Sequence, residues 1–140
     1  MPKPQYVYHG SQYLFDVVRP RQARGANAWE SQKAIYAAET MENAIPFALP
    51  IRWYPDDPTG KRAFSCENGK TLIEYGSLDP NGVGYVYKLK ADTFEKVDEW
   101  QWISMFEVVP DETICIRVKD YMDTVSFSEK AKEIQNELFK

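Results

Sequence analysis

The chain has 140 residues, of which 44% are hydrophobic and 27% charged, and its formal net charge is -4. This length and composition predict one packed domain over residues 1–140 and exclude an intrinsically disordered chain. The acidic balance argues against general nucleic-acid binding, because phosphate contacts require a basic surface. No stretch approaches the ~20 apolar residues of a membrane span, and the N-terminus lacks an apolar signal core. We therefore expect a cytoplasmic protein with no membrane partner.

In chain order, the first third of the sequence predicts short strands, irregular segments and one helix. The predicted elements are a strand at 5–9, a helical turn or irregular segment at 12–18, a polar loop at 19–32, a strand at 34–37 and a helix at 40–49. Thr40 is a suitable N-cap, and Pro46 predicts that the helix is short or kinked. Ala44, Phe47 and Ala48 fall at helical spacing, so we expect them to face a sheet.

The rest of the chain is predicted to be rich in strands. A loop at 50–60, strands at 62–66, 71–75, 84–89, 100–109 and 113–118, and a C-terminal helix beginning at Ser126 or Ser128 follow in turn. The pair Asn68-Gly69 indicates a type I′ hairpin between the first two of these strands. Many strands with short helices between them indicate an α+β fold.

The two cysteines, Cys66 and Cys115, both lie in strand-like runs. With one histidine and no Cys-x-x-Cys pair, the sequence offers no recognisable zinc site, and we expect no metal. Free buried thiols are the simplest interpretation. A Cys–His nucleophile pair that uses His9 is the alternative.

His9 is the only histidine, and it ends the alternating run Tyr6-Val7-Tyr8. It is followed by Gly10, which lets a ligand approach the backbone closely, and by Ser11, which adds a hydroxyl. Binding groups often lie at such strand ends. The alternative is an ordinary histidine in a strand-to-loop turn.

His9-Gly10-Ser11, followed by Ala34-Ile35-Tyr36-Ala37-Ala38 before an alanine-rich helix, resembles the ADP-ribosyltransferase superfamily. The likeness is to its His-Tyr-Glu branch, the poly(ADP-ribose) polymerase and diphtheria-toxin type. The resemblance implies that His9 contacts the ribose of NAD and that Gly10 pairs with the nicotinamide amide. It also implies that Tyr36 stacks on the nicotinamide ring and that Phe47 supplies a second aromatic face.

The third motif of this branch is a glutamate at the start of a later strand, and Glu99 in Asp98-Glu99-Trp100 is the candidate. The resemblance implies that Glu99 stabilises the positive charge that develops as nicotinamide leaves, which a nearby carboxylate would favour. Gln101 would point to the same side of a strand and is a rival for this position. The alternative is that Glu99 is a solvated turn carboxylate.

Three arginines, Arg19, Arg21 and Arg24, crowd the loop between the first two motifs. Guanidinium groups clamp phosphates through bidentate hydrogen bonds, so Arg21 and Arg24 are candidates for holding the diphosphate of NAD. The alternative is a solvated loop whose arginines pair with surface carboxylates.

The resemblance implies a fold of two small opposed sheets, antiparallel or mixed, with short helices, a C-terminal helix and NAD in the cleft between the sheets. It implies an enzyme that cleaves the nicotinamide–ribose bond of NAD and transfers ADP-ribose to an unknown macromolecular acceptor or to water. A non-catalytic module that binds NAD, ADP-ribose or a protein is the main alternative. An NAD-dependent 2′-phosphotransferase acting on RNA, and a purely structural role for Trp53, Trp100 and Trp102, are the others.

Overall fold

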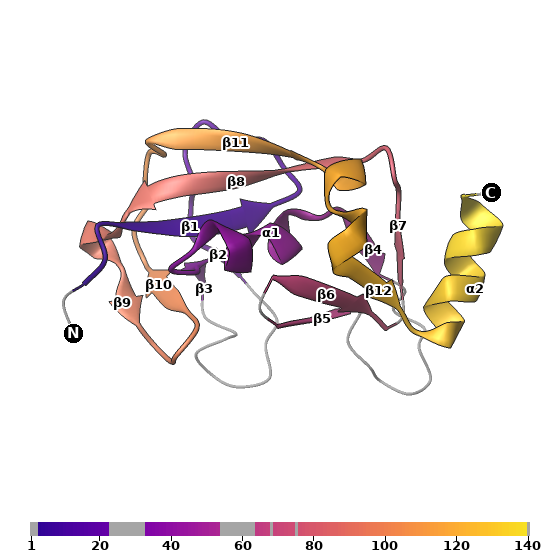
Figure 1. Cartoon of the computed structure of the whole chain (residues 1–140). Helices are drawn as coiled ribbons and strands as arrows, with labels where there is room; N and C mark the ends of the chain where they lie inside the picture. The colour runs from indigo at the N-terminus through magenta and orange to yellow at the C-terminus, as the bar shows by residue number, and fades with distance from the viewer. Residues whose placement is uncertain (1–2, 23–32, 54–63, 68, 75, 140) are drawn as a thin grey trace.

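The computed structural model describes residues 3–22, 33–53, 64–67, 69–74 and 76–139. Within them the chain forms a small mixed α+β fold with several sheets and two α-helices (Figure 1). The strands are β1 (Tyr6–Ser11), β2 (Arg21–Gln22), β3 (Lys33–Ala37), β4 (Ile51–Trp53), β5 (Phe64–Glu67), β6 (Lys70–Ile73), β7 (Gly76–Leu78), β8 (Val83–Lys90), β9 (Glu95–Lys96), β10 (Trp102–Ser104), β11 (Glu112–Arg117) and β12 (Val125–Phe127). The helices are α1 (Met41–Ala48) and α2 (Glu129–Leu138), with 3-10 turns at Ala91–Thr93, Val118–Asp120 and Met122–Thr124.

The long strands form an antiparallel sheet in the order β1-β8-β11, seen across the upper part of Figure 1. A second sheet has the order β2-β3-β10-β9, and two smaller sheets have the orders β12-β6-β5 and β4-β7. The first two sheets meet where the backbones of Tyr8 and Ala38 exchange two hydrogen bonds of 2.8 Å. This bridge brings the end of β3 against the middle of β1. The predicted α+β class is therefore confirmed.

Helix α1 lies directly on β1 and β8, and two glycines make this approach possible. A Cβ atom at Gly10 would collide with the backbone oxygen of Ala44, and one at Gly84 would collide with that of Ala48. Since only glycine lacks this atom, the helix can pack backbone to backbone on the sheet. Gly10 therefore has a structural role besides any contact with a ligand.

The prediction for α1 is correct in its position and partly wrong in its orientation. The Thr40 side chain accepts a hydrogen bond from the amide of Asn43, as an N-cap does, and Pro46 lies inside the helix. Ala44 and Ala48 are buried against the sheet, but the Phe47 side chain is 49% exposed. The helix is so close to Gly10 and Gly84 that only small residues fit beneath it.

Both faces of the β1-β8-β11 sheet are covered by apolar residues. The core cluster on the α1 side includes Ala48, Leu78, Val86, Ile116 and Val118. The cluster on the β3 side includes Val7, Ile35, Tyr87, Leu89 and Phe94. Alternation along β8 accounts for this division, because Val86 and Tyr87 point to opposite faces.

Several predicted elements differ from the structure. Residues 12–18 form an irregular segment, which was one of the two expectations. Residues 51–53 of the predicted loop at 50–60 form β4, and the predicted strand at 100–109 is confined to β10. Beyond β10, the Ser104 hydroxyl accepts a hydrogen bond from the amide of Phe106 at 3.1 Å and so captures the backbone in a turn. Both cysteines lie in strands as expected, but Cys66 and Cys115 are exposed, so the prediction of buried thiols is wrong.

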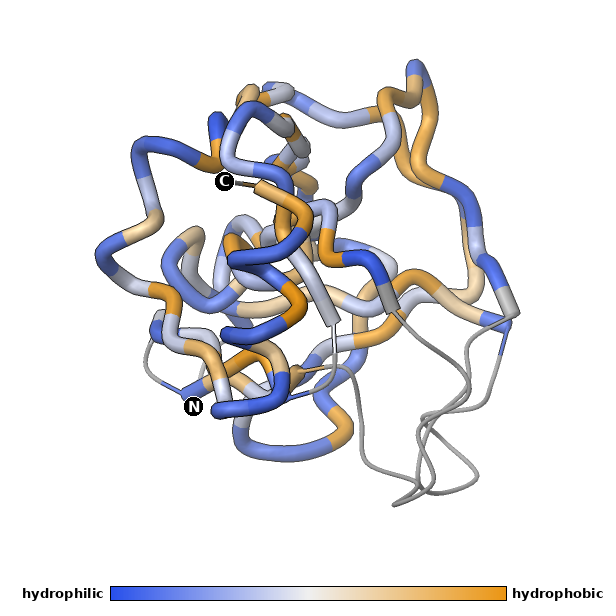
Figure 2. The backbone as a smooth tube through the Cα atoms, turned by 90° about the vertical axis from the view of Figure 1, so that its right-hand side faces the viewer, coloured by the Kyte–Doolittle hydropathy of each residue, from blue (hydrophilic) through white to orange (hydrophobic). Residues whose placement is uncertain are grey.

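The predicted hairpin and C-terminal helix are present. Strands β5 and β6 pair antiparallel, and Gly69 has the positive φ of 77° that favours glycine, while Asn68 lies outside the described residues. Ser128, rather than Ser126, caps α2, whose turns alternate between hydrophilic and hydrophobic residues in the foreground of Figure 2. In the described part of the chain, neither helix is long and apolar enough to cross a membrane.

Candidate ligand-binding cleft

A cleft of about 260 Å³ opens at the C-terminal end of β1. Its walls come from β1, β2, β3, α1 and the segment that follows β1, and its lining residues are His9, Gly10, Ser11, Gln12, Tyr13, Phe15, Arg19, Arg21, Ala34 and Phe47. Five residues that were proposed from the sequence are thus brought together: His9, Gly10, Ser11, Arg21 and Phe47. Tyr36 and Glu99 are not among the lining residues, and Arg24 lies outside the described residues.

The His9 ring is held in one tautomer. Its Nδ1 lies 2.6 Å from the backbone oxygen of Tyr36. Because a carbonyl oxygen can only accept, Nδ1 carries the proton and Nε2 is the ring atom left to accept a hydrogen bond. Burial lowers the pKa of His9 below its usual 6.5, and the charge of Arg21 lowers it further, against the hydrogen bond to Tyr36. At neutral pH His9 is therefore an uncharged acceptor.

The backbone of Gly10 offers a hydrogen-bonding edge. Tyr8 directs its N–H and C=O away from β8, toward Ala38. In an antiparallel strand these groups alternate in direction, so Gly10, two residues on and opposite Val86, also directs its N–H and C=O away from β8. Among the described residues no backbone bond outside the strand ladders uses them. Gly10 thus presents one donor and one acceptor side by side.

Aromatic side chains form one wall of the cleft. The Tyr87 hydroxyl donates to the carbonyl of Tyr13 at 2.6 Å and accepts from the amide of Phe15 at 2.7 Å. The rings of Phe15 and Tyr87 stack with centroids 5.8 Å apart, and the His9 and Tyr87 rings lie 6.2 Å apart. Burial raises the pKa of Tyr87, so its hydroxyl keeps its proton. Ser11 also holds this segment, because its hydroxyl accepts from the amide of Tyr13 at 3.1 Å.

The described arginines of the cleft differ in their partners. The guanidinium of Arg21 lies over the Phe15 ring at 4.3 Å and near the Tyr13 ring at 5.9 Å, which are cation–π contacts. Arg19 instead forms an ion pair of 3.2 Å with Glu107, and both side chains are largely exposed. Arg21 is therefore the arginine whose charge is available to an anionic ligand.

Tyr36 contributes its backbone to the site. It lies in β3 opposite Ile103, is half-buried, and its carbonyl fixes the His9 ring. Alternation places its side chain on the same face of β3 as Ala34, which does line the cleft.

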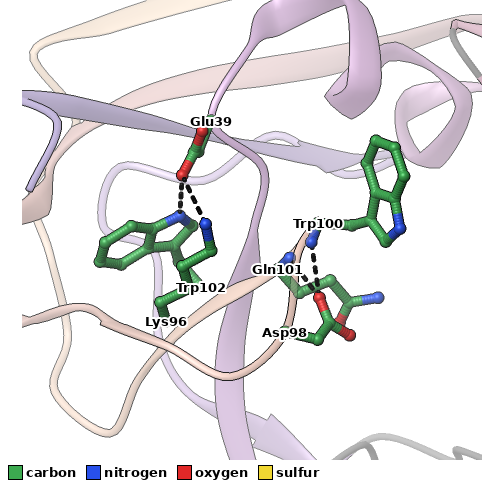
Figure 3. Close-up of polar contacts among 6 residues, drawn as sticks. All are labelled: Glu39, Lys96, Asp98, Trp100, Gln101 and Trp102. Carbon is green, nitrogen blue, oxygen red and sulfur yellow. Dashed lines mark hydrogen bonds and ion pairs between the residues drawn. The ribbon is translucent and has the colours of Figure 1, made fainter. Parts of the chain in front are cut away.

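Glu99 lies in the exposed turn between β9 and β10. The Asp98 carboxylate accepts hydrogen bonds of 2.7 Å from the amides of Trp100 and Gln101, which fixes this turn (Figure 3). In the register of β10 on β3, Trp102 is opposite Ala37, so the turn lies past the C-terminal end of β3. Ala34, at the other end of β3, lines the cleft. The structure therefore does not bring Glu99 or its rival Gln101 to the cleft lining.

Glu39 is a carboxylate that the sequence analysis did not single out. Its Oε1 accepts a hydrogen bond of 2.8 Å from Trp102 Nε1 and lies 3.6 Å from Lys96 Nζ (Figure 3). It joins β9 and β10 to the connection between β3 and α1, which is a structural role.

Within the described residues, no group of three or more histidine, cysteine or acidic side chains is placed to hold a metal ion. Comparisons of the chain with protein-family models, with curated proteins and with solved structures found no match.

Proposed function

We propose that this chain is an ADP-ribosyltransferase-like protein whose cleft binds the nicotinamide riboside portion of NAD or of a related nucleotide. The observation that carries the proposal is the combination of the fixed His9 tautomer and the open backbone edge of Gly10 in one cleft. The donor and acceptor of Gly10 complement the oxygen and the amino group of the carboxamide. The bare Nε2 of His9 complements a ribose hydroxyl.

The other walls suit the same ligand. Phe47 offers a half-exposed aromatic face to the electron-poor nicotinamide ring. Arg21 offers a guanidinium to the diphosphate that follows the ribose. The volume of about 260 Å³ is just below the range of roughly 300–1,000 Å³ typical of pockets for drug-sized ligands, so it suits one half of a dinucleotide.

Binding is better supported than transfer of ADP-ribose. Cleavage of the nicotinamide–ribose bond requires stabilisation of the positive charge that develops on the ribose, and a carboxylate beside it is the natural source. The described residues that line the cleft include no carboxylate, and Glu99 lies in the β9–β10 turn. Transfer to a macromolecular acceptor remains the alternative that the resemblance implies.

Calorimetric titration with NAD tests the proposal. Phe47→Ala and His9→Ala should each weaken binding about tenfold or more, the loss expected for one buried contact worth ~1.4 kcal/mol. Phe106→Ala is the matched control, because Phe106 is 66% exposed and does not line the cleft. Absence of heat with wild-type protein at millimolar NAD, or equal affinity in all variants, would refute the proposal.

If NAD binds, release of nicotinamide decides between a binding module and a transferase. Wild-type protein should bind without releasing nicotinamide. Release that is lost in Glu99→Gln would instead establish cleavage of the nicotinamide–ribose bond, with ADP-ribose passed to an acceptor or to water, and release that is lost in Gln101→Ala would assign the role to Gln101.

A further inference from the structure

The segment that joins β1 to β2 forms one wall of the cleft without being helical or part of a strand. Tyr13 and Phe15 lie in it, and its regular pairing with the rest of the described chain is one bridge between Val18 and Val108, with hydrogen bonds of 2.9 Å in both directions. Side chains must therefore fix the positions of Tyr13 and Phe15.

Tyr87 makes the closest of these contacts. It lies in the middle of β8, opposite His9, and is completely buried. Its hydroxyl bonds two main-chain groups of the segment, the carbonyl of Tyr13 and the amide of Phe15, at 2.6 and 2.7 Å. Such a hydroxyl satisfies a donor and an acceptor that would otherwise be orphaned by burial.

The same contact extends to the charged group of the cleft. The Phe15 ring stacks on the Tyr87 ring, and the Arg21 guanidinium lies over the other ring of this pair, that of Phe15, at 4.3 Å. A shift of the segment would move the surface on which Arg21 rests. Tyr87 is therefore connected to Arg21 through the backbone and the ring of Phe15.

We propose that Tyr87 is a positioning residue, whose hydroxyl holds the Tyr13–Phe15 segment so that Phe15 sets the place of Arg21 in the cleft. The effect on ligand rests on the proposed function, whereas the effect on the segment does not. Tyr87→Phe removes the hydroxyl and keeps the ring. Tyr85→Phe is the matched control, because Tyr85 lies in the same strand on the same face and its hydroxyl forms no hydrogen bond within the described residues.

Amide hydrogen exchange tests the segment directly. In Tyr87→Phe, the Phe15 amide should exchange at least ~10-fold faster, since it loses its acceptor, while the amides of Leu89 and Ile116 in the core strands stay protected. Tyr85→Phe should exchange like wild type. Unchanged exchange at Phe15 in Tyr87→Phe would overturn the proposal, and so would loss of protection throughout the chain.

Titration with ADP-ribose, which carries the diphosphate but no nicotinamide, tests the link to Arg21. Tyr87→Phe and Arg21→Gln should each weaken binding about tenfold. The double variant should bind about as well as the poorer of the two single variants, because both substitutions remove the same contact of Arg21 with the ligand. Additive losses, or unchanged affinity in Tyr87→Phe, would overturn the positioning role. If wild type binds neither ADP-ribose nor NAD, the proposed function fails, and the exchange experiment alone decides the role of Tyr87.

Discussion

The Gln135 side chain forms hydrogen bonds with the edge of β7, as a neighbouring strand would. Substituting Gln135 should therefore destabilise the fold by a predictable amount. Its Oε1 accepts from the amide of Leu78 at 2.9 Å and its Nε2 donates to the carbonyl of Leu78 at 2.6 Å. Leu78 is fully buried, so Gln135→Leu leaves two polar groups without a partner. At ~1–3 kcal/mol for each of the two orphaned groups, the free energy of unfolding should fall by about 2–6 kcal/mol.

Urea denaturation measures this change through the midpoint, with an unchanged m-value. The control is Asn136→Ala, an exposed neighbour on α2, which should stay within ~0.5 kcal/mol of wild type. A loss below ~0.5 kcal/mol in Gln135→Leu would refute the reasoning, since surface substitutions produce changes of that size.

Gln135→Glu adds a test by pH. A protonated carboxyl group can donate to the Leu78 carbonyl and accept from its amide, whereas an ionised one faces the carbonyl oxygen with negative charge. Folding should therefore raise the pKa of the new side chain above the ordinary ~4.3 of glutamate. The variant should match wild type most closely below ~pH 4.3 and lose stability relative to it as the pH rises through the raised pKa.

Three further predictions concern Thr71, Arg21 and His9. The hydroxyl of Thr71 is buried and has no hydrogen-bond partner among the described residues, so Thr71→Val should raise the free energy of unfolding by ~1 kcal/mol in urea denaturation, and a loss of stability would contradict this. Arg21→Gln should weaken NAD binding about tenfold in calorimetry, whereas Arg19→Gln should leave the affinity nearly unchanged because Arg19 already pairs with Glu107. Equal losses of affinity in the two variants would contradict this prediction. Because folding lowers the pKa of His9 below 6.5, the stability of wild type relative to His9→Gln should be constant above that pH and fall as the pH drops toward the lowered pKa; denaturation across this range that shows no such fall would contradict it.

Local signals in the sequence were sufficient for the longer elements. Thr40 and the spacing of Ala44 and Ala48 located α1, alternation located β1, and the strand-like runs at 34–37, 84–89 and 113–118 located β3, β8 and β11. Strands β4, β7 and β12 have three residues each, which is too short to show a period. Each pairs with a strand far away in the sequence, β4 with β7 and β12 with β6. The exposure of Phe47 depended on how closely two glycines let α1 approach the sheet, which no helical period reveals.

The candidate site was predictable where it lies in one stretch of chain. His9, Gly10 and Ser11 adjoin in sequence and line the cleft together. Tyr87 was missed because its contact with the site depends on the pairing of β1 with β8, which alternation does not specify. For Glu99 the short motif carried no information on the hairpin in which it lies.

The most direct test of the proposed site is nitrogen NMR of protein labelled with ¹⁵N-histidine, because His9 is the only histidine in the chain and gives one pair of ring signals. We expect a protonated Nδ1 and a bare Nε2 in the free protein. Added NAD should shift the Nε2 signal as it accepts a bond from the ribose, while nicotinamide, which lacks the ribose, should shift it much less. A protonated Nε2 in the free protein, or ring signals that do not move at saturating NAD, would contradict the proposed role of the cleft.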